Sequence, residues 1–377
     1  MTFYGASISA HQTEGMNRQS DWWDFEHTVL AKRGIEPSGN GVDHWHRFRE
    51  DINFLSDNGL QAFRFSIEWA RIEPEEGRFD EDALAHYDEV IKYAKQNHLV
   101  ICLTLWHFTL PQWASKRGGM MDKVVRERFL NFARLCGKRW GNDIDLWVTM
   151  NEPMVYLMEG YRHGHWPPQI QSRMKAMRMF GILRRLHHRA YRILKEAGIH
   201  HVGIAKSVIS YLPGKRFSPR NLIQSFRNFI WNTAFFVSDW KMHDFIGINY
   251  YISTKFGDGK ELERDDMGWI IRPDGLRFAL EQFRGFKKPI YITENGIATE
   301  DDEKRIAYLS SHISAMHEAR DSGLDVRGYF YWSLLDNFEW DKGYSKRFGL
   351  VEVDRMTMKR SAKRSLEEFG RMAAGGE

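Results

Sequence analysis

Eight short apolar runs alternate with longer segments of helical periodicity, and this alternation restricts the possible folds more than any other feature. Continuous apolar runs of this kind are typical of parallel strands that are covered on both faces. Eight strand–helix units in one chain predict an α/β fold, a closed (β/α)8 TIM barrel. We expect strands at Tyr4–Ser9, Ala62–Ser66, Val100–Trp106, Leu146–Met150, Val202–Lys206, Phe245–Asn249, Ile290–Thr293 and Gly328–Ser333.

The segments between these runs have the pattern of amphipathic helices. Apolar residues recur on one face of Asp80–His98, with Asp80 as the expected N-cap, and a similar stripe runs through Lys304–Ser322. An open doubly wound sheet is the main alternative, but such folds carry a glycine-rich turn after the first strand. Gly5 is followed by Ala-Ser-Ile-Ser instead. No linker interrupts the pattern, so residues 1–377 are predicted to form a single domain.

Composition argues against several classes of partner. The 54 Lys and Arg residues barely exceed the 50 Asp and Glu residues, so nucleic acid is not expected as a partner. The most basic stretch, Arg184–Lys195, has apolar residues at helical spacing and is interpreted as a solvated helix face. No apolar run approaches the ~20 residues of a membrane span, and no signal peptide is evident. We therefore expect no membrane partner and a cytoplasmic location.

The two cysteines and the 16 histidines indicate neither a disulfide framework nor a metal site. Cys102 lies in an expected strand and Cys136 in an expected helix, so both are predicted to be buried thiols. The histidines show no ligand spacing beside Cys or acidic residues. The expectation is therefore an apolar, thiol-containing core and a site without metal.

Two glutamates follow apolar strand runs that lie nearly half the sequence apart. Glu152 ends the stretch Leu146–Glu152 and precedes a proline, and Glu294 lies in Pro289–Gly296. In a barrel the carboxyl ends of all strands meet at one mouth, which is where such enzymes place their catalytic groups. A facing pair of carboxyl groups about 5–5.5 Å apart is the machinery of a retaining glycoside hydrolase. A lone Glu after a strand would be an ordinary surface residue, but this pair is not alone.

The other strand ends also carry groups suited to a polyhydroxylated ring. Each of these residues alone is more often structural than functional. Together, a ring of amides, an imidazole, a carboxylate and indoles at one mouth favours sugar binding. The residues are Gln12 after the first strand, Arg64 on the second, Trp106-His107 at the third, Asn249-Tyr250-Tyr251 at the sixth, and Trp332 with Asp336–Trp340 at the eighth.

The motifs Asn151-Glu152-Pro153, Tyr291–Gly296 and Tyr331–Trp340 resemble those of glycoside hydrolase family 1, the β-glucosidase family. The resemblance covers nearly the whole chain and implies that Glu152 is the acid/base and Glu294 the nucleophile. It also implies that Trp332 is the stacking floor of the terminal sugar and that no cofactor is needed. By the same resemblance, Arg64 and Tyr251 contact the nucleophile, and the sugar hydroxyls are held by Gln12, His107, Asn151, Glu339 and Trp340.

Two residues separate this chain from specialised relatives. Members that act on 6-phosphorylated sugars resemble one another in having a small hydroxyl residue where Trp340 stands here. Relatives that hydrolyse thioglucosides carry glutamine where Glu152 stands here. Both differences favour hydrolysis of an ordinary O-glycoside.

The chain is shorter than typical family members, mainly between the fifth and sixth strands. Only residues 207–244 join these strands, and this shortening predicts looser leaving-group specificity, a more open cleft and a lower turnover. The aromatic run Phe226–Trp240 falls in this connection. It is interpreted as ordinary packing of a helix on the barrel, with a helix that plugs the flank as the alternative.

These observations predict a retaining β-glycosidase. Its expected substrates are small β-glycosides or oligosaccharides with terminal β-linked glucose, and galactose or fucose in addition. One alternative is a transglycosylase, in which an acceptor sugar replaces water. The other is a barrel that binds a sugar or an apolar cofactor without useful catalysis.

Overall fold

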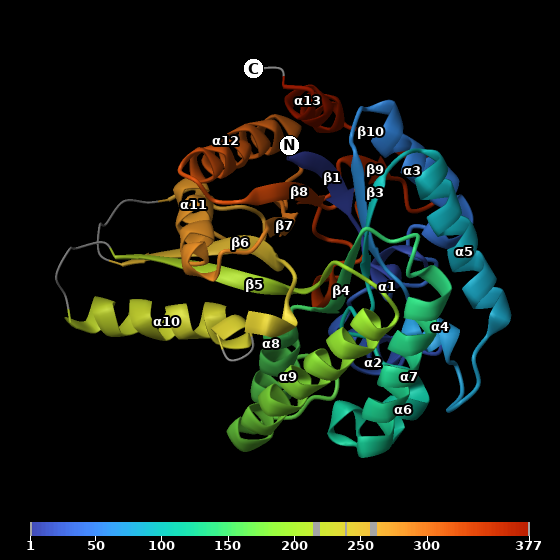
Figure 1. The fold of residues 1–377 in the computed structure, drawn as a ribbon. Coiled ribbons are helices and arrows are strands. Elements are labelled where there is room, and N and C mark those ends of the chain that lie inside the picture. Colours follow the sequence, from blue (N-terminus) through green and yellow to red (C-terminus); the bar gives the residue numbers. More distant parts are fainter. Residues whose placement is uncertain (1, 214–218, 238–239, 257–261, 376–377) are drawn as a thin grey trace.

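Eight parallel strands close into a barrel in the order of the sequence, which confirms the predicted fold class (Figure 1). The computed structural model describes residues 2–213, 219–237, 240–256 and 262–375. β1 lies between β2 and β8, and the register of Phe3 with Gly328 and of Ser7 with Trp332 closes the ring. The strands are β1 (Phe3–Ser7), β2 (Ala62–Ser66), β3 (Val100–Thr104), β4 (Leu146–Asn151), β5 (Val202–Pro213), β6 (Ile246–Phe256), β7 (Ile290–Asn295) and β8 (Val326–Trp332).

Most strand limits agree with prediction to within a few residues, but β5 and β6 extend much further than expected. β5 has 12 residues rather than ending at Lys206, and β6 has 11 rather than ending at Asn249. The two strands continue to pair beyond the barrel, for example Ser210 with Ser253. Polar residues interrupt the apolar pattern of these outer parts, at Ser207 and Ser210 of β5 and at Ser253–Lys255 of β6, and so hid the extension.

Helices surround the barrel on its outside (Figure 1). The predicted N-cap is confirmed, since the Asp80 carboxylate accepts a hydrogen bond from the backbone N–H of Ala83. The longer helices are α3 (His44–Asp57), α5 (Glu81–Gln96), α7 (Lys123–Trp140), α9 (Arg173–Glu196), α10 (Pro219–Val237), α11 (Pro273–Glu281), α12 (Asp302–Asp321) and α13 (Arg364–Ala373).

Short elements lie mostly in the connections that follow the strands. A small antiparallel pair, β9 (Val351–Val353) and β10 (Arg360–Ala362), follows the barrel. The short α-helices are α1 (Ala10–Thr13), α2 (Asp21–Phe25), α4 (Trp69–Ile72), α6 (Gln112–Lys116) and α8 (Pro153–Tyr156). The π-helices are η1 (Glu26–Leu30) and η4 (Leu157–His163), and the 3₁₀ turns are η2 (Ala31–Arg33), η3 (Gly119–Met121), η5 (Trp240–Met242), η6 (Arg284–Phe286) and η7 (Trp340–Lys342).

Two apolar layers hold the barrel together. A large layer fills the space between strands and helices, and a smaller cluster that includes Cys102, Phe245 and Phe330 fills the barrel interior. Cys102 and Cys136 are both free and buried, as predicted. Among the helices of the described residues, none combines the length and apolarity that crossing a bilayer requires.

The connection between β5 and β6 carries α10, which only partly packs as expected. Phe235 and Phe236 near its end are buried, and Phe235 contacts Phe180 of α9 with ring centroids 5.1 Å apart. Phe226 is 63% exposed, so the first part of the aromatic run does not pack on the barrel. The helix therefore covers the flank with its second half only.

Candidate active site

A hollow of about 490 Å³ opens at the carboxyl ends of the strands. Glu152 directly follows β4 and Glu294 lies at the end of β7, so both carboxyl groups reach the same mouth. Of the residues to which the family resemblance gave a role, Gln12 and Arg64 do not line the hollow, and both are buried. The predicted residues that line it are His107, Asn151, Glu152, Tyr251, Glu294, Trp332, Glu339 and Trp340.

The backbone turns sharply at Glu152, where the strand ends. Its φ of 41° and ψ of 56° lie in the left-handed region, which is costly for a residue with a Cβ. Its N–H donates to the carbonyl of Ala205 on β5, and Pro153 begins α8 directly afterwards. Such strained positions persist only where the surrounding structure holds them in place, and they are concentrated at active sites.

Glu294 receives hydrogen bonds on both carboxylate oxygens. The buried Arg64 guanidinium pairs with Oε1, and the Tyr251 hydroxyl donates to Oε2 at 2.8 Å. Both donors stabilise a negative charge on this carboxylate. Arg64 and Tyr251 thus both contact Glu294, the residue that the family resemblance assigned them to contact.

Hydrogen bonds through two asparagine side chains connect Arg64, the partner of Glu294, to Glu152. Arg64 also donates to Oδ1 of Asn151 at 2.7 Å. Asn249, at the carboxyl end of the barrel part of β6, donates from the same Nδ2 to Asn151 Oδ1 and to Glu152 Oε1, each at 3.0 Å. The two carboxyl groups are therefore held in one hydrogen-bonded frame.

The two glutamates differ in electrostatic environment. Burial is the largest influence on Glu152 and, together with the nearby Glu294, it raises the pKa of Glu152 to about 8. Burial and Glu294 likewise raise the pKa of Glu339 to about 8. At neutral pH Glu152 and Glu339 therefore hold protons, while Glu294 pairs with Arg64.

Aromatic and polar groups form the remaining wall. The imidazole of His107 lies nearly parallel to Trp332 and to Trp340, with interplanar angles of 24° and 19°. Burial holds the pKa of His107 well below its usual range, so the ring is neutral. Gln12 donates to Glu339 Oε2 at 3.4 Å. Flat rings and fixed amides of this kind suit a pyranose.

The sequence model described as Glycosyl hydrolase family 1 matches residues 2–243 and 249–374. The chain belongs to glycosyl hydrolase family 1. It is a glycoside hydrolase of β-glucosidase type, and the family acts with retention of anomeric configuration.

Relatives within family 1 agree over nearly the whole chain. β-Glucosidase A of Thermotoga maritima is 30% identical over 425 aligned positions, which cover 96% of this chain and 94% of that protein. A solved β-glucosidase from Thermotoga maritima in complex with glucoimidazole has a TM-score of 0.91 and 29% identity, covering 100% of this chain and 98% of that chain. A chloroplastic galactolipid galactosyltransferase of Arabidopsis thaliana is 32% identical, covering 93% of this chain and 60% of that protein. The alignment with β-glucosidase A is longer than these 377 residues, so that relative has segments that this family 1 chain lacks.

Three residues of this family 1 site were given no individual role from the sequence. Asn249 was counted among the strand-end groups suited to a sugar, and Trp231 of α10 was noted only as part of an aromatic run, yet Trp231 lines the hollow. Trp269 also lines it, from a segment without strand or helix pattern. Trp231 and Trp269 widen the aromatic lining beyond the predicted ring.

Lys206 is a further residue that sequence reasoning missed. It was treated as the end of a strand, but its side chain is buried and its Nζ donates to the carbonyl of Trp231 at 2.6 Å. Burial lowers the pKa of Lys206 to about 7. A lysine within an apolar run was the available sequence signal, since burying a charged amine is costly.

A group of potential metal ligands lies at the edge of the hollow, where none was expected. The ligating atoms of Glu159, His163 and His165 are within 4.8 Å of one another. Glu159 and His163 lie on one face of the π-helix η4, and His165 Nδ1 is 2.7 Å from Glu159 Oε2. These hydrogen bonds account for the cluster without an ion.

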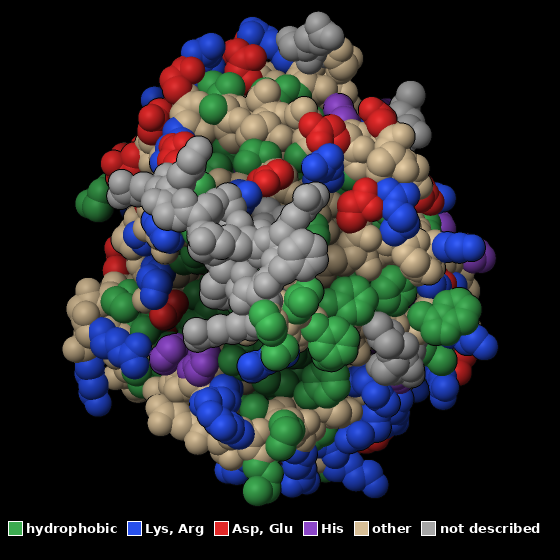
Figure 2. Space-filling view, turned by 90° about the vertical axis from the view of Figure 1, so that its left-hand side faces the viewer, with side chains coloured by type: hydrophobic (Ala, Val, Ile, Leu, Met, Phe, Trp, Pro, Cys, Tyr) green, Lys and Arg blue, Asp and Glu red, His purple; other side chains and the backbone are tan. Residues whose placement is uncertain are grey.

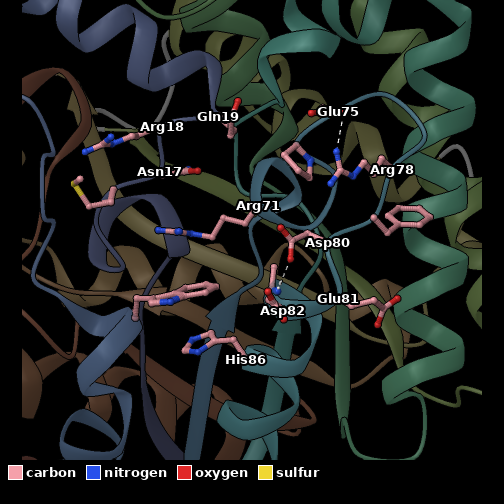
Figure 3. A pocket seen from close by; sticks show the side chains of 15 residues that line it. Asn17, Arg18, Gln19, Arg71, Glu75, Arg78, Asp80, Glu81, Asp82 and His86 are labelled. Atoms are coloured by element: carbon pink, nitrogen blue, oxygen red, sulfur yellow. Dashed lines mark hydrogen bonds and ion pairs between the residues drawn. The ribbon is translucent and has the colours of Figure 1, made fainter.

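A second hollow, of about 820 Å³, lies outside the ring of predicted residues (Figure 3). Arg71, Asp80 and His86 project into it from α4, the N-cap of α5 and α5 (Figure 3). Arg78 at its rim pairs with Glu75 at 3.3 Å, and Asp80 caps its own helix. Glu75 and Asp80 are thus engaged in local structure, and the smaller hollow, where Glu152 and Glu294 share a hydrogen-bonded frame, is the better candidate.

Proposed function

We propose that the chain is a retaining β-glycosidase that removes terminal β-linked glucose and also accepts galactose or fucose. The observation that carries this proposal is the contrast between its two glutamates. Glu294 is surrounded by hydrogen-bond donors, whereas Glu152 has its pKa raised to about 8 by burial and by Glu294. A charged nucleophile beside a protonated acid is the arrangement that a retaining hydrolase requires.

In the first step, the Glu294 carboxylate attacks the anomeric carbon. The bond to the leaving oxygen breaks, and Glu152 gives its proton to that oxygen. Esterification of Glu294 removes the negative charge that raises the pKa of Glu152, so this pKa falls and the residue becomes a base. Glu152 then takes a proton from water, water attacks the anomeric carbon, and Glu294 is released.

The remaining predicted residues take supporting roles in this proposal. Arg64 and Tyr251 position and stabilise Glu294, and Asn151 is held where it can bind a sugar hydroxyl. Trp332 provides the stacking surface. Gln12, His107, Glu339 and Trp340 bind the other hydroxyl groups. The similar β-glucosidase from Thermotoga maritima, solved in complex with glucoimidazole, supports a glucose-like ring in this position.

The leaving-group side is bounded partly by Trp231 of the helix between β5 and β6. The shortness of that connection supports broad leaving-group acceptance and a turnover below that of longer family members. Comparison of kcat on cellobiose with that of such a member tests this, and equal turnover contradicts it.

The test is hydrolysis of p-nitrophenyl β-glucoside, β-galactoside and β-fucoside by the wild type and by Glu152→Gln and Glu294→Gln. We expect loss of about 1,000-fold or more in each variant. Glu159→Gln is the matched control, since this carboxylate lines the same hollow but contacts neither glutamate. The first sugar product seen by NMR should be the β-anomer. An α-anomer, or full activity in Glu294→Gln, refutes the proposal.

Azide supplies a second test of the assigned roles. Glu294→Gly with azide should yield an α-glycosyl azide, since azide enters from the face that the carboxylate occupied. Glu152→Gly with azide should yield the β-azide through the intact covalent intermediate. The opposite pattern would exchange the two roles.

Transglycosylation is a second candidate, because one relative is described as a galactosyltransferase. Product analysis with an acceptor sugar, from low concentration to a large excess, distinguishes it from hydrolysis. Predominant transfer at low acceptor concentration favours the transferase.

A further inference from the structure

Helix α10 exposes an apolar face that a helix of a globular protein normally buries. Five apolar side chains on this face are between 40% and 63% exposed, at positions i, i+1, i+4, i+7 and i+8. These residues, the α10 face, are Leu222, Ile223, Phe226, Phe229 and Ile230.

The opposite side of α10 attaches to the barrel through polar groups. Asn228 and Asn232 are buried, and both donate to the backbone carbonyl of Ile209 on β5, at 2.7 and 2.8 Å. The Asn232 side chain also accepts from the Ile209 N–H at 3.1 Å. The helix is thus fixed with its amides inward and its large apolar residues outward, so the exposure is built in.

Other large apolar side chains are exposed on η5 and at the start of α9. Trp240 of η5 is 52% exposed, and Met174 and Met177 at the start of α9 are 76% and 71% exposed. Figure 2 shows hydrophobic side chains gathered on this side of the molecule, with Lys and Arg side chains below them. Patches of this kind on soluble proteins usually mark an interaction site.

The segment that carries this surface is rich in basic residues. Residues 160–238 contain 14 Lys and Arg residues and one acidic residue, Glu196, although the whole chain has 54 against 50. Arg173, Lys175 and Arg178 alternate with the exposed methionines at the start of α9, and all three are exposed. Arg227 is exposed within α10 itself.

We propose that the α10 face, with the start of α9 and Trp240, docks on an anionic lipid surface. Large apolar side chains enter the boundary between head groups and acyl chains, and surrounding basic residues pair with lipid phosphates. A second copy of the chain fits less well, because two such basic surfaces repel each other. This proposal departs from the expectation of no membrane partner and requires no spanning segment.

The position of α10 determines where the barrel mouth lies relative to the docked surface. Trp231, which follows Ile230 of the α10 face, lines the hollow that contains Glu152 and Glu294. The docked surface therefore lies beside the mouth of the barrel. Docking depends on surface residues only, so its test is independent of whether the proposed glycosidase activity is found.

The test is flotation of the full chain with vesicles of phosphatidylcholine alone or with one-third phosphatidylglycerol. We expect binding to the anionic vesicles only, weakened by salt because screening shortens the range of the attraction. Phe226→Ser with Ile230→Ser should weaken binding by about 10-fold or more. Reversal of three charges, in Arg173→Glu, Lys175→Glu and Arg178→Glu together, should do the same.

Two controls are matched for residue type elsewhere on the surface. Met356→Ser removes an apolar side chain that is 92% exposed, and Lys92→Glu reverses an exposed charge on α5. Neither should change vesicle binding, and thermal melting checks that every variant folds. If a variant fails to fold, the lipid and salt dependence of the wild type still decides.

Three results overturn the proposal. The first is no binding to anionic vesicles, and the second is equal binding to both kinds of vesicle. The third is a concentration-dependent dimer that forms without vesicle binding and is dissolved by Phe226→Ser with Ile230→Ser. That result would assign the α10 face to a second copy.

Discussion

Asn249 offers the sharpest test of how the structure sets the acid/base. Its Nδ2 donates to Glu152 Oε1 at 3.0 Å, and this hydrogen bond lowers the pKa of Glu152 against the larger effects of burial and Glu294. Asn249→Leu removes the donor and keeps the same branched arrangement of side-chain heavy atoms. A hydrogen bond to a charged group contributes about 1.5–3 kcal/mol. At about 1.4 kcal/mol per pKa unit, its loss should raise the pKa of Glu152 by about 1–2 units.

The assay is the pH dependence of kcat/KM on p-nitrophenyl β-glucoside. The basic limb reports loss of the Glu152 proton in the free enzyme, near pH 8 in the wild type. In Asn249→Leu this limb should move to higher pH by about 1–2 units. The proton that Glu152 must donate is then held more firmly, so activity should begin to fall only at a higher pH.

The matched control is Thr293→Val. The Thr293 hydroxyl donates to Asn249 Oδ1 at 2.6 Å, so this variant loosens the amide without removing its donor to Glu152. Its basic limb should move less than that of Asn249→Leu. A folded Asn249→Leu enzyme whose basic limb stays in place would refute the assignment of that limb to Glu152.

Three further changes probe the site and the frame around it. Tyr251→Phe removes the 2.8 Å hydrogen bond to Glu294 and should lower kcat/KM by about 10- to 100-fold in aryl glucoside assays. The folded protein lowers the pKa of Lys206 to about 7, whereas the unfolded chain keeps this proton up to a higher pH. The unfolding free energy of the wild type therefore rises between pH 7 and 10. Lys206→Met lacks this rise. The unfolding free energy of Lys206→Met relative to that of wild type, measured by urea titration, should therefore decrease by on the order of 4 kcal/mol between pH 7 and 10. Asp51→Asn breaks a fully buried pair with Arg360 and should cost about 3–5 kcal/mol of unfolding free energy, measured by urea denaturation.

Each of these changes has a counterpart at an ordinary position. Tyr93→Phe removes a hydroxyl bond to Asn53 far from the site and should leave kcat/KM unchanged. Lys92→Met removes an exposed amine and should show no such change of stability with pH. Arg49→Ala breaks an exposed pair and should cost less than about 1 kcal/mol. Equal effects in variant and counterpart would contradict the structural reasoning.

The barrel was predictable because its strands are buried on both faces and therefore leave continuous apolar runs in the sequence. In the outer parts of β5 and β6 polar residues interrupt the apolar ones, at Ser207 and Ser210 and at Ser253–Lys255, so no continuous run marked them. The residues around Glu152 and Glu294 were predictable from motifs at strand ends. Asn249 was visible as one such end, but its link between Asn151 and Glu152 depends on three strands meeting in space.

Two other features could not be read from the sequence for different reasons. The aromatic run of α10 indicated a packed helix, and only the orientation fixed by Asn228 and Asn232 shows that part of it faces outward. The group of Glu159 and His163 depends on a π-helical turn, whose spacing differs from that of an α-helix. Both depend on backbone geometry that a hydrophobic pattern does not encode.

The closure of the ring by β1 and β8 affects how the protein is made. Thr2 Oγ1 donates to the carbonyl of Val326, a contact between residues 324 positions apart. β1 leaves the ribosome first, and its partner on one side leaves after all the other barrel strands. Until then the growing sheet has open edges that invite wrong pairing. The nascent chain should therefore depend on chaperone protection through most of its synthesis, and the final closing step should be post-translational.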